Sequence, residues 1–334
     1  MTVHAERASG RAPIVDPAHV AYVGEGTAPA GDRGGALPAR AALAPSVVAD
    51  LIRLTKPRIT VMVVTTMLGG MWVASRYARA AGADPRPTGQ LAIALLGTAL
   101  VVSGANALNM YIERDTDRLM DRTKERPLPA RRLAPEVALW FGGVLSAASI
   151  PLLLFGVNTT TGLLSTLALL SYVLVYTPLK RRTTLALPIG AVPGAIPPLL
   201  GWTSVTDRVD APGFLLFAVL FLWQIPHFLA IATFRREDYR RAGLKVLPVE
   251  KGDAVTRRHI VGYLALLVLA TVLLVPLGVG GPVYLTSAIV LGAAFFGLGA
   301  YGLRQGTGAR WARGLFFASM VYLVLIFAAL MVGA

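Results

Sequence analysis

Residues 103–132 read SGANALNMYIERDTDRLMDRTKERPLPARR. This stretch begins inside a long apolar run and continues into a group of carboxylates and arginines. Asn109, Glu113 and Asp117 are spaced four residues apart, so on an α-helix their side chains share one face. Asp121 continues the row one turn later. Mg²⁺ prefers oxygen ligands of this kind. The row therefore predicts a divalent metal site at the end of a helix, with these four residues as ligands.

The same stretch is also rich in cations, namely Arg114, Arg118, Arg122, Lys124 and Arg126. Carboxylates beside cations suit a metal–diphosphate complex, in which the acids hold the metal and arginine forks bind phosphate oxygens. The alternative is a helix end with surface ion pairs, which are common and contribute little to stability. Asn106 and Asn109 favour the functional interpretation, because polar groups within an apolar span are costly and usually have a role.

Composition indicates a membrane protein. Apolar residues make up 55% of the chain and the mean hydropathy is +0.61, with long runs almost free of charge. The net charge of +14 raises the question of nucleic acid, but the basic residues fall at the ends of apolar runs, so we expect no nucleic-acid partner. The chain has no cysteine, which excludes disulfides and thiolate chemistry.

The apolar runs predict an all-α, polytopic bundle of nine transmembrane helices, and we expect two parts: a disordered cytoplasmic tail over residues 1–47 and a membrane domain over 48–334. The fifth run holds Pro188, Pro193, Pro197 and Pro198, so we expect that helix to be broken or kinked. The nine predicted spans are 59–76, 90–112, 135–156, 161–177, 185–202, 213–234, 260–279, 282–301 and 311–332.

The distribution of Lys and Arg predicts the orientation. With nine spans, one side of the membrane receives 24 of these residues and the other side only four, which are Arg76, Arg79, Arg86 and Arg208. The positive-inside rule makes the basic side cytoplasmic. We therefore expect the N-terminus and the acidic–basic cluster on the cytoplasmic side of the cell membrane.

Two further polar loops lie on the predicted cytoplasmic side. The first contains Lys180 and Arg181, which either mark the topology or fold over the site to bind a leaving diphosphate. The second follows the sixth span, where Glu237 and Asp238 would form a second metal-facing cluster opposite the first. Both loops are candidates for completing a site whose first part is the row of oxygen ligands.

From about residue 51 to the C-terminus the chain resembles the UbiA-like intramembrane prenyltransferase superfamily, and within it the protohaem IX farnesyltransferases. The first motif, Asn106-x-x-Asn109-x-x-x-Glu113-x-Asp115-x-Asp117, is typical of the superfamily. The haem branch is indicated by Trp223-Gln-Ile-Pro-His-Phe228 and by Asp238-Tyr-x-x-Ala-Gly243. The resemblance also includes Thr55-Lys-Pro-Arg58 and Tyr176-Thr-Pro-Leu-Lys-Arg-Arg-Thr183.

The resemblance implies an enzyme that transfers farnesyl from farnesyl diphosphate to a vinyl group of haem B with addition of water, giving haem O and diphosphate. It implies Mg²⁺ as cofactor, the lipid bilayer as surroundings, and a supply of haem to haem A synthase or a terminal oxidase. The implied catalytic residues are Asn109, Glu113, Asp117, Arg122, Lys180 and Asp238. The implied cofactor-binding residues are Arg126, Arg181, His227 and Tyr239.

Several interpretations stay open from the sequence. His227 is either a packing residue, a ligand or hydrogen-bond partner of a porphyrin, or a proton acceptor. The chain as a whole is alternatively an aromatic prenyltransferase of quinone biosynthesis. A transporter is a third possibility, but charges at the membrane midplane and corresponding broken helices in two halves, which transporters often have, are mostly missing.

Overall fold

The computed structural model describes residues 46–84, 86–304 and 307–333. These described residues belong to one compact unit. The predicted tail lies outside the described residues except for its last two: Ser46 caps a helix that begins at Val47. The division of the chain into a tail and a membrane domain therefore stays a prediction.

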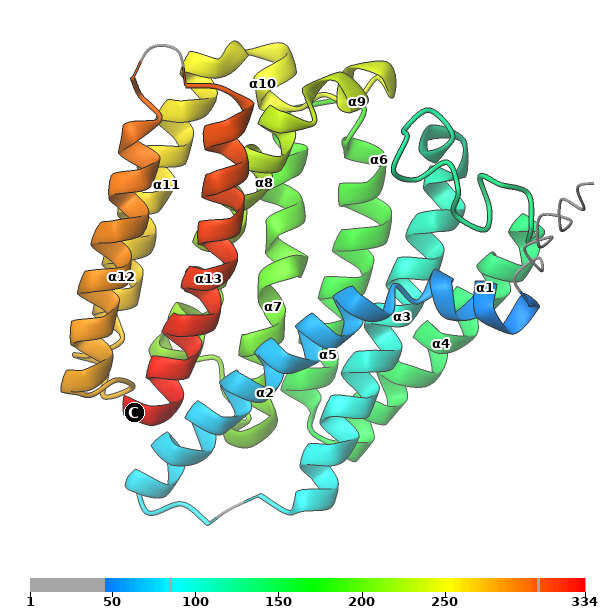
Figure 1. Ribbon diagram of the computed structural model, residues 1–334. Coiled ribbons are helices and arrows are strands. Elements are labelled where there is room, and N and C mark those ends of the chain that lie inside the picture. Colours follow the sequence, from blue (N-terminus) through cyan, green and yellow to red (C-terminus); the bar gives the residue numbers. More distant parts are fainter. Residues whose placement is uncertain (1–45, 85, 305–306, 334) are drawn as a thin grey trace, which may run out of the picture. The chain divides into compact units, whose positions relative to one another are not determined.

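The described residues fold into helices without a β-strand, which confirms the all-α class (Figure 1). In chain order they are α1 (Val47–Leu54), α2 (Pro57–Ala80), α3 (Thr88–Asp117), α4 (Pro135–Gly156), α5 (Thr159–Leu170), the π-helix η1 (Ser171–Tyr176), α6 (Thr177–Leu179), α7 (Ala186–Thr206), α8 (Ala211–Phe234), α9 (Arg236–Arg241), α10 (Leu247–Glu250), α11 (Gly252–Leu273), α12 (Pro282–Tyr301) and α13 (Ala309–Gly333).

Eight helical stretches of the described chain are long and apolar enough to cross a membrane, so this is a multi-pass membrane protein. They are α2, α3, α4, the continuous stretch Thr159–Leu179, α8, α11, α12 and α13. The predicted fifth span corresponds to α7, which has 21 residues and no charge but is not one of these eight stretches.

The fifth helix was expected to be broken or kinked, and α7 is not broken, because it is continuous with Pro193, Pro197 and Pro198 inside it. Close packing against α2 supports it. A Cβ atom at Gly70 would fall on the carbonyl oxygen of Pro198, and one at Gly201 on that of Met67. Small residues let the two backbones approach at these points, as is common between transmembrane helices.

The seventh predicted span was placed too far along the chain. The expected helix over 260–279 is observed as α11, Gly252–Leu273. The helix starts earlier because the polar residues Arg257 and Arg258 are still helical, and it ends before Pro276, whose ring is incompatible with a helix interior. An apolar run therefore marks the part of a helix within lipid and leaves the polar first turns unmarked.

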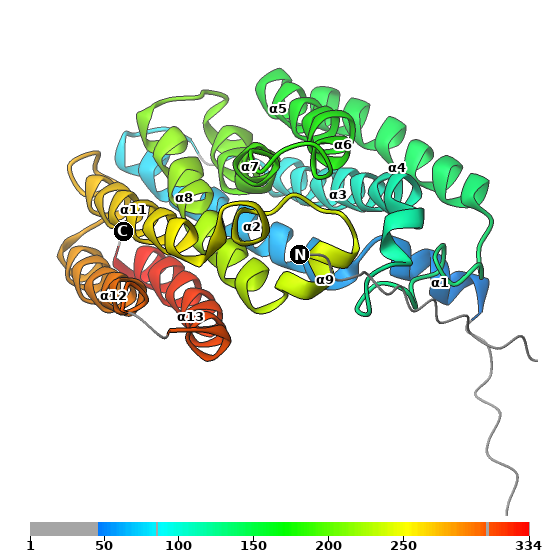
Figure 2. The ribbon, with the colours of Figure 1, turned by 90° about the horizontal axis from the view of Figure 1, so that it is seen from above.

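The short polar elements gather at one end of the bundle. α9, α10 and the link from α3 to α4 lie at the upper end in Figure 1, and the α2–α3 link lies at the lower end. Seen from above, α9 lies over the middle of the unit, with α3 and α4 on one side and α11, α12 and α13 on the other (Figure 2). The upper end is therefore where loops from distant parts of the sequence meet.

Candidate functional site

Asn109 is the innermost member of the oxygen row and is only 1% exposed. Its Nδ2 donates to Oγ1 of Thr177 at 3.1 Å. Thr177 in turn donates its only hydroxyl proton to the carbonyl of Tyr172 at 2.8 Å. The Thr177 hydroxyl reaches this carbonyl, five residues earlier in the chain, because the preceding turn is a π-helix. Such turns are frequent at functional sites. Thr177 therefore fixes the Asn109 amide with Nδ2 toward its hydroxyl and Oδ1 on the opposite side.

Lys56 occupies the direction in which the Asn109 oxygen points. Its Nζ lies 2.9 Å from Oδ1 of Asn109. The residue has the left-handed backbone conformation (φ 48°) at the start of α2, and Asn106 holds the preceding turn by donating to the carbonyl of Thr55 at 3.2 Å. Burial, with a further contribution from Arg126, lowers the pKa of Lys56 to about 7. Our list of site residues missed Lys56, although the Thr55-Lys-Pro-Arg58 motif contains it.

Glu113, one turn further along α3, is paired with Lys180. The Nζ atom of Lys180 lies 2.8 Å from Oε1 of Glu113 and 4.4 Å from the centre of the Tyr176 ring. Burial alone would lower the pKa of Lys180, but Tyr176 and Glu113 outweigh it and raise this pKa. Lys180 therefore stays protonated and lies against Glu113 of the row, while its binding of a leaving diphosphate stays a prediction.

Asp117 ends α3 and is paired with Arg126. The distance from NH1 of Arg126 to Oδ2 of Asp117 is 2.6 Å, and the carboxylate is 1% exposed. Thr123 donates to the backbone carbonyl of Asp117 at 2.8 Å, which turns the following loop back toward the helix. The structure thus brings Asn109, Glu113 and Asp117 together in one row, each with a cation from a different segment.

Asp121 does not continue this row, because α3 ends at Asp117. Its side chain is 59% exposed and is paired with Arg241 at 2.6 Å. Arg241 also pairs with Asp238 at 2.5 Å, so it bridges the loop after α3 to α9. The hydrogen bond from Arg241 lowers the pKa of Asp121. Asp238 is buried beside Arg235 and Arg241, so these two acids form a separate cluster held by arginine.

The remaining predicted residues differ in their surroundings. Arg122 and Arg181 are exposed and form no ion pair within the described residues. Tyr239 is half-buried against Met120, and burial raises its pKa against the opposing effect of Arg122. His227 lies on α8, away from the ion pairs, where its Nδ1 is 2.7 Å from Oγ of Ser319.

The oxygen row offers donors of the right chemistry for a hard divalent cation. No three His, Cys, Asp or Glu side chains cluster within residues 46–84, 86–304 and 307–333. The donors are therefore two carboxylates, Glu113 and Asp117, and the amide oxygen of Asn109. Mg²⁺ commonly binds through one or two carboxylates and completes its shell with water and substrate phosphate, so this donor set fits it.

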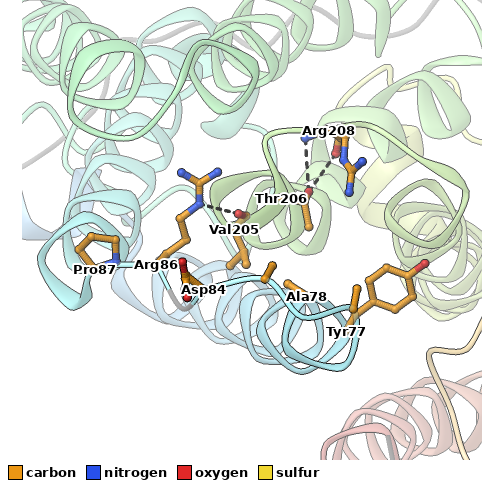
Figure 3. A pocket seen from close by; sticks show the side chains of 10 residues that line it. Tyr77, Ala78, Asp84, Arg86, Pro87, Val205, Thr206 and Arg208 are labelled. Atoms are coloured by element: carbon orange, nitrogen blue, oxygen red, sulfur yellow. Dashed lines mark hydrogen bonds between the residues drawn. The ribbon is translucent and has the colours of Figure 1, made fainter.

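A separate cavity of about 400 Å³ lies at the opposite end of the bundle (Figure 3). Tyr77, Arg86, Val205 and Arg208 are among its lining residues, and Nε of Arg86 donates to the carbonyl of Val205 at 2.7 Å. The 24 residues of α2 span about 36 Å between Lys56 and this end. None of the predicted site residues lines this cavity, so it is not part of the oxygen row.

Comparison with known proteins agrees with this architecture. Residues 62–321 match the model of the UbiA prenyltransferase family. A protoheme IX farnesyltransferase of Sorangium cellulosum is 78% identical over 280 residues, which cover 82% of this chain and all of the relative. A protein of the same name from Myxococcus xanthus is 51% identical over 292 residues, covering 87% of this chain and 97% of the relative.

Solved structures share the fold at low identity. A digeranylgeranylglyceryl phosphate synthase superposes with a TM-score of 0.73 at 17% identity, covering 86% of this chain and 98% of that one. A UbiA homologue from Archaeoglobus fulgidus, solved with GPP and Mg²⁺ bound, gives a TM-score of 0.57 at 17% identity, covering 84% and 99%. With its oxygen row, its helical membrane bundle and these matches, the chain belongs to the UbiA prenyltransferase family.

Proposed function

We propose that this protein transfers the farnesyl group of farnesyl diphosphate to a vinyl group of haem B, with addition of water, to give haem O and diphosphate. The choice of haem and farnesyl is supported by the relatives named protoheme IX farnesyltransferase, which align over almost their whole length. The observation that carries the reaction class is the row of Asn109, Glu113 and Asp117, faced by Lys56, Lys180 and Arg126.

Asn109, Glu113 and Asp117 would hold Mg²⁺, which supplies positive charge to the diphosphate as it departs. The UbiA homologue solved with GPP and Mg²⁺ supports the presence of a metal ion in prenyl diphosphate binding. Asp121 and Asp238 would act from the loops above through Arg241, the arginine that they share. Removing one well-placed electrostatic contact at a developing charge typically lowers a rate by about 10²–10³.

Lys56, Lys180 and Arg126 would bind diphosphate oxygens. Lys180 and Arg126 balance the two carboxylates, and the protonated fraction of Lys56, whose pKa is lowered to about 7, adds positive charge. This surplus suits a metal–diphosphate complex that is itself negative. Arg122 and Arg181, both exposed and without an ion pair in the described chain, would close over the diphosphate from the solvent side. Tyr239, near Arg122, would line the same entrance.

The bond between farnesyl C1 and the diphosphate oxygen breaks, and the diphosphate leaves with the electron pair. The π electrons of the haem vinyl group form the new carbon–carbon bond, and water adds to the resulting cation with release of one proton. The burial of Asn109 and Asp117 would help to keep bulk water from the farnesyl cation until the vinyl group reacts.

We further infer that the oxygen row faces the cytoplasm in the inner membrane. The 24 Lys and Arg residues of the predicted basic side lie in the loops and helix ends at the polar end of the bundle. Only four Lys or Arg residues lie at the other end, so the positive-inside rule places the polar end in the cytoplasm. This orientation makes the site accessible to soluble farnesyl diphosphate. It also leaves the product haem in the membrane, where haem A synthase or a terminal oxidase would receive it.

The test is expression in cells that lack haem O synthase, followed by mass analysis of the extracted haems. We expect haem O in cells that carry the chain and none in cells with the empty vector. A parallel assay offers isolated membranes haem B or 4-hydroxybenzoate together with a prenyl diphosphate and Mg²⁺. Prenylation of 4-hydroxybenzoate instead of haem would overturn the proposal in favour of quinone biosynthesis.

A further inference from the structure

The cavity at the end of the bundle away from the oxygen row contains charged side chains that lack partners. Arg86, Arg208 and Asp84 line this space of about 400 Å³, which is within the range of about 300–1,000 Å³ typical of ligand sites. Neither arginine forms an ion pair within the part of the chain that the structure describes. Among the same described residues, the Asp84 carboxylate forms no ion pair and no hydrogen bond. The cavity thus offers both signs of charge to a ligand.

Arg86 is held in place by the end of α7. Its Nε donates to the carbonyl oxygen of Val205 at 2.7 Å, which leaves the hydrogens of its two terminal nitrogens for a ligand. The backbone turns after α7 at Asp207, which is left-handed (φ 55°), and the turn is followed by Arg208 at the same cavity. Figure 3 shows the two guanidinium groups on either side of Val205 and Thr206. Two arginine forks at one cavity suit an anion with several oxygens, such as a phosphate.

The cavity lies at the depth of lipid headgroups. The 21 residues of α7 span about 32 Å, which matches a hydrocarbon core of about 30 Å, so Val205 and Thr206 at its end are at a membrane surface. The rings of Tyr77 and Trp202 pack together at 5.1 Å near this end, and tyrosine and tryptophan are enriched at this depth. Phosphate groups of membrane lipids therefore lie at the level of both cavity arginines.

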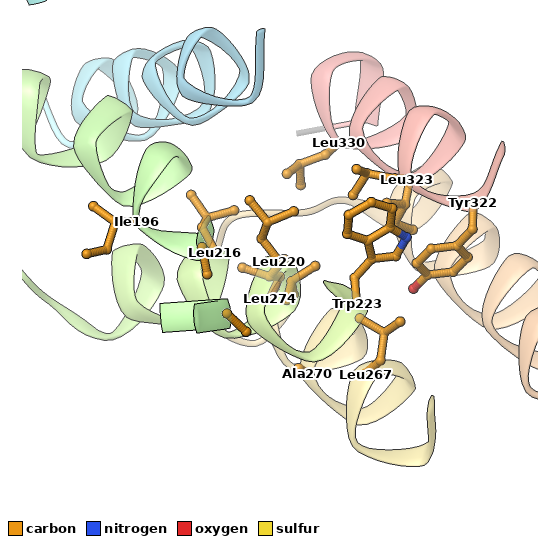
Figure 4. Packing of buried hydrophobic residues seen from close by; sticks show 14 of the residues in the cluster. Ile196, Leu216, Leu220, Trp223, Leu267, Ala270, Leu274, Tyr322, Leu323 and Leu330 are labelled. Atoms are coloured by element: carbon orange, nitrogen blue, oxygen red, sulfur yellow. The ribbon is translucent and has the colours of Figure 1, made fainter. Parts of the chain in front are cut away.

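Packed apolar side chains lie between this cavity and the other end of the bundle. Leu216 and Leu220 of α8 are buried with Leu330 of α13 (Figure 4), and Val205 of the cavity wall belongs to the same core. A ligand of this cavity must therefore enter from the membrane or the solvent at its own end. It is a different molecule from the diphosphate proposed for the oxygen row.

The charges of the cavity match a zwitterion better than a plain anion. Only four Lys or Arg residues of the described chain lie at this end, and two of them, Arg86 and Arg208, line the cavity. Asp84 lines it too, yet it pairs with neither arginine. A free phosphate would meet a repelling carboxylate here, whereas a phosphodiester that carries an ammonium group satisfies both signs of charge. A primary ammonium also donates hydrogen bonds to a carboxylate, which a quaternary ammonium cannot do.

We propose that this cavity binds the headgroup of phosphatidylethanolamine from the membrane leaflet at this end. Arg86 and Arg208 bind the phosphodiester oxygens, and Asp84 accepts hydrogen bonds from the ammonium group. Basic pockets between transmembrane helices are known to bind lipid headgroups. The bound headgroup joins the link after α2 to the end of α7. The inference does not depend on the proposed function, because this lipid takes no part in prenyl transfer.

The test measures lipid binding by native mass spectrometry of the full chain in detergent micelles. Phosphatidylethanolamine, phosphatidylcholine and phosphatidylglycerol with the same acyl chains are titrated separately. We expect the wild type to bind phosphatidylethanolamine about fivefold or more tightly than phosphatidylcholine, because only the primary ammonium donates to Asp84. Inorganic phosphate should not displace the bound lipid. Displacement by inorganic phosphate would show a phosphate site instead and would overturn the proposal.

Two charge variants test the two halves of the headgroup separately. Arg208→Ala should weaken binding of phosphatidylethanolamine and phosphatidylglycerol about tenfold, because a charge-assisted hydrogen bond to the shared phosphate is lost. Asp84→Asn should weaken binding of phosphatidylethanolamine alone, since phosphatidylglycerol has no ammonium group. Both side chains lack partners in the described chain, so both variants should melt at the wild-type temperature in lipid-free micelles. Arg79→Ala removes an exposed arginine at the same end that does not line the cavity, and this control should change nothing.

Equal wild-type affinities for phosphatidylethanolamine and phosphatidylcholine would overturn the proposal. So would an Asp84→Asn variant with the same lipid preference as the wild type, or an Arg208→Ala variant with wild-type affinity for both lipids. The readout is binding alone, so a failure to form haem O would count against the proposed function and not against this site.

Discussion

Glu113 and Lys180 are 67 residues apart in the sequence, yet their side chains meet at 2.8 Å and join the end of α3 to the loop after α6. A backbone hydrogen bond of 3.0 Å from Lys245 to the carbonyl of Lys180 extends this connection to the loop after α9. Three polar segments that are separate in the chain are therefore linked through the Lys180 region.

Glu113→Gln should lower the rate of haem O formation by about 10²–10³ while the protein remains inserted in the membrane. The substitution keeps the shape of the side chain but removes the negative charge that faces Lys180. The measurement is turnover in isolated membranes with saturating farnesyl diphosphate, haem B and Mg²⁺. Asp115→Asn is the matched control, since Asp115 is two residues away but 66% exposed. Activity of Glu113→Gln within severalfold of wild type would remove Glu113 from the metal site.

Lys56→Met should raise the KM for farnesyl diphosphate by about tenfold or more, because a charge-assisted hydrogen bond to phosphate is lost. Lys56→Arg should recover part of the affinity, since it restores the charge. The control is Arg58→Ala, which removes an exposed cation two residues away. Steady-state kinetics in detergent would measure the KM for farnesyl diphosphate of each variant. Equal KM values for Lys56→Met and wild type would show that Lys56 serves only to hold Asn109.

Arg126→Met should destabilise the protein by about 3 kcal/mol, because it leaves the buried carboxylate of Asp117 without its partner. The double substitution Arg126→Met with Asp117→Leu should regain most of that stability, since it removes both charges, but it should stay inactive. Thermal unfolding in detergent gives the stability, and haem O formation gives the activity. If the double variant were as unstable as Arg126→Met alone, the unpaired charge would not be the cause.

Gly70→Ala should destabilise the bundle by about 2 kcal/mol through overpacking, because the new methyl group would fall on the carbonyl oxygen of Pro198. Gly143→Ala on α4 is the control. A Cβ atom there meets nothing within 4 Å, so the change should be neutral or slightly stabilising. Melting temperatures of the two variants in the same detergent test this prediction. Equal melting temperatures would mean that α2 and α7 move apart at little cost.

Much of the membrane architecture is predictable because every helix that crosses lipid needs a long run of apolar residues. The spans at 135–156 and 282–301 coincide with α4 and α12, and the row of Asn109, Glu113 and Asp117 follows from helical periodicity. The predicted position of Asp121 on the row is wrong because the periodicity does not indicate where α3 ends. The apolar pattern also missed α1, whose eight residues are too few to cross a membrane.

The pairing of charges was the least predictable part of the site. The sequence shows many cations near the oxygen row, but which one meets which acid depends on loops that fold back over the bundle. Lys56 illustrates the difficulty: it reaches Asn109 only because its backbone is left-handed and Asn106 holds the turn before it. No local pattern indicates a left-handed lysine, so the contact of Lys56 with Asn109 is seen only in three dimensions.

The near balance of charge in the oxygen row has a consequence for how the proposed substrates arrive. A lone metal ion would have to displace Lys180 or Arg126 from its carboxylate, which would leave that buried cation without a partner. A lone phosphate ester would have to draw the same cation away, which would leave the buried carboxylate without a partner. A preformed magnesium salt of the ester gives the carboxylate a metal ion and the cation a phosphate at the same time, so neither group is left without a partner. For the proposed reaction, we therefore expect metal and ester to enter together, with binding of each strongly dependent on the other.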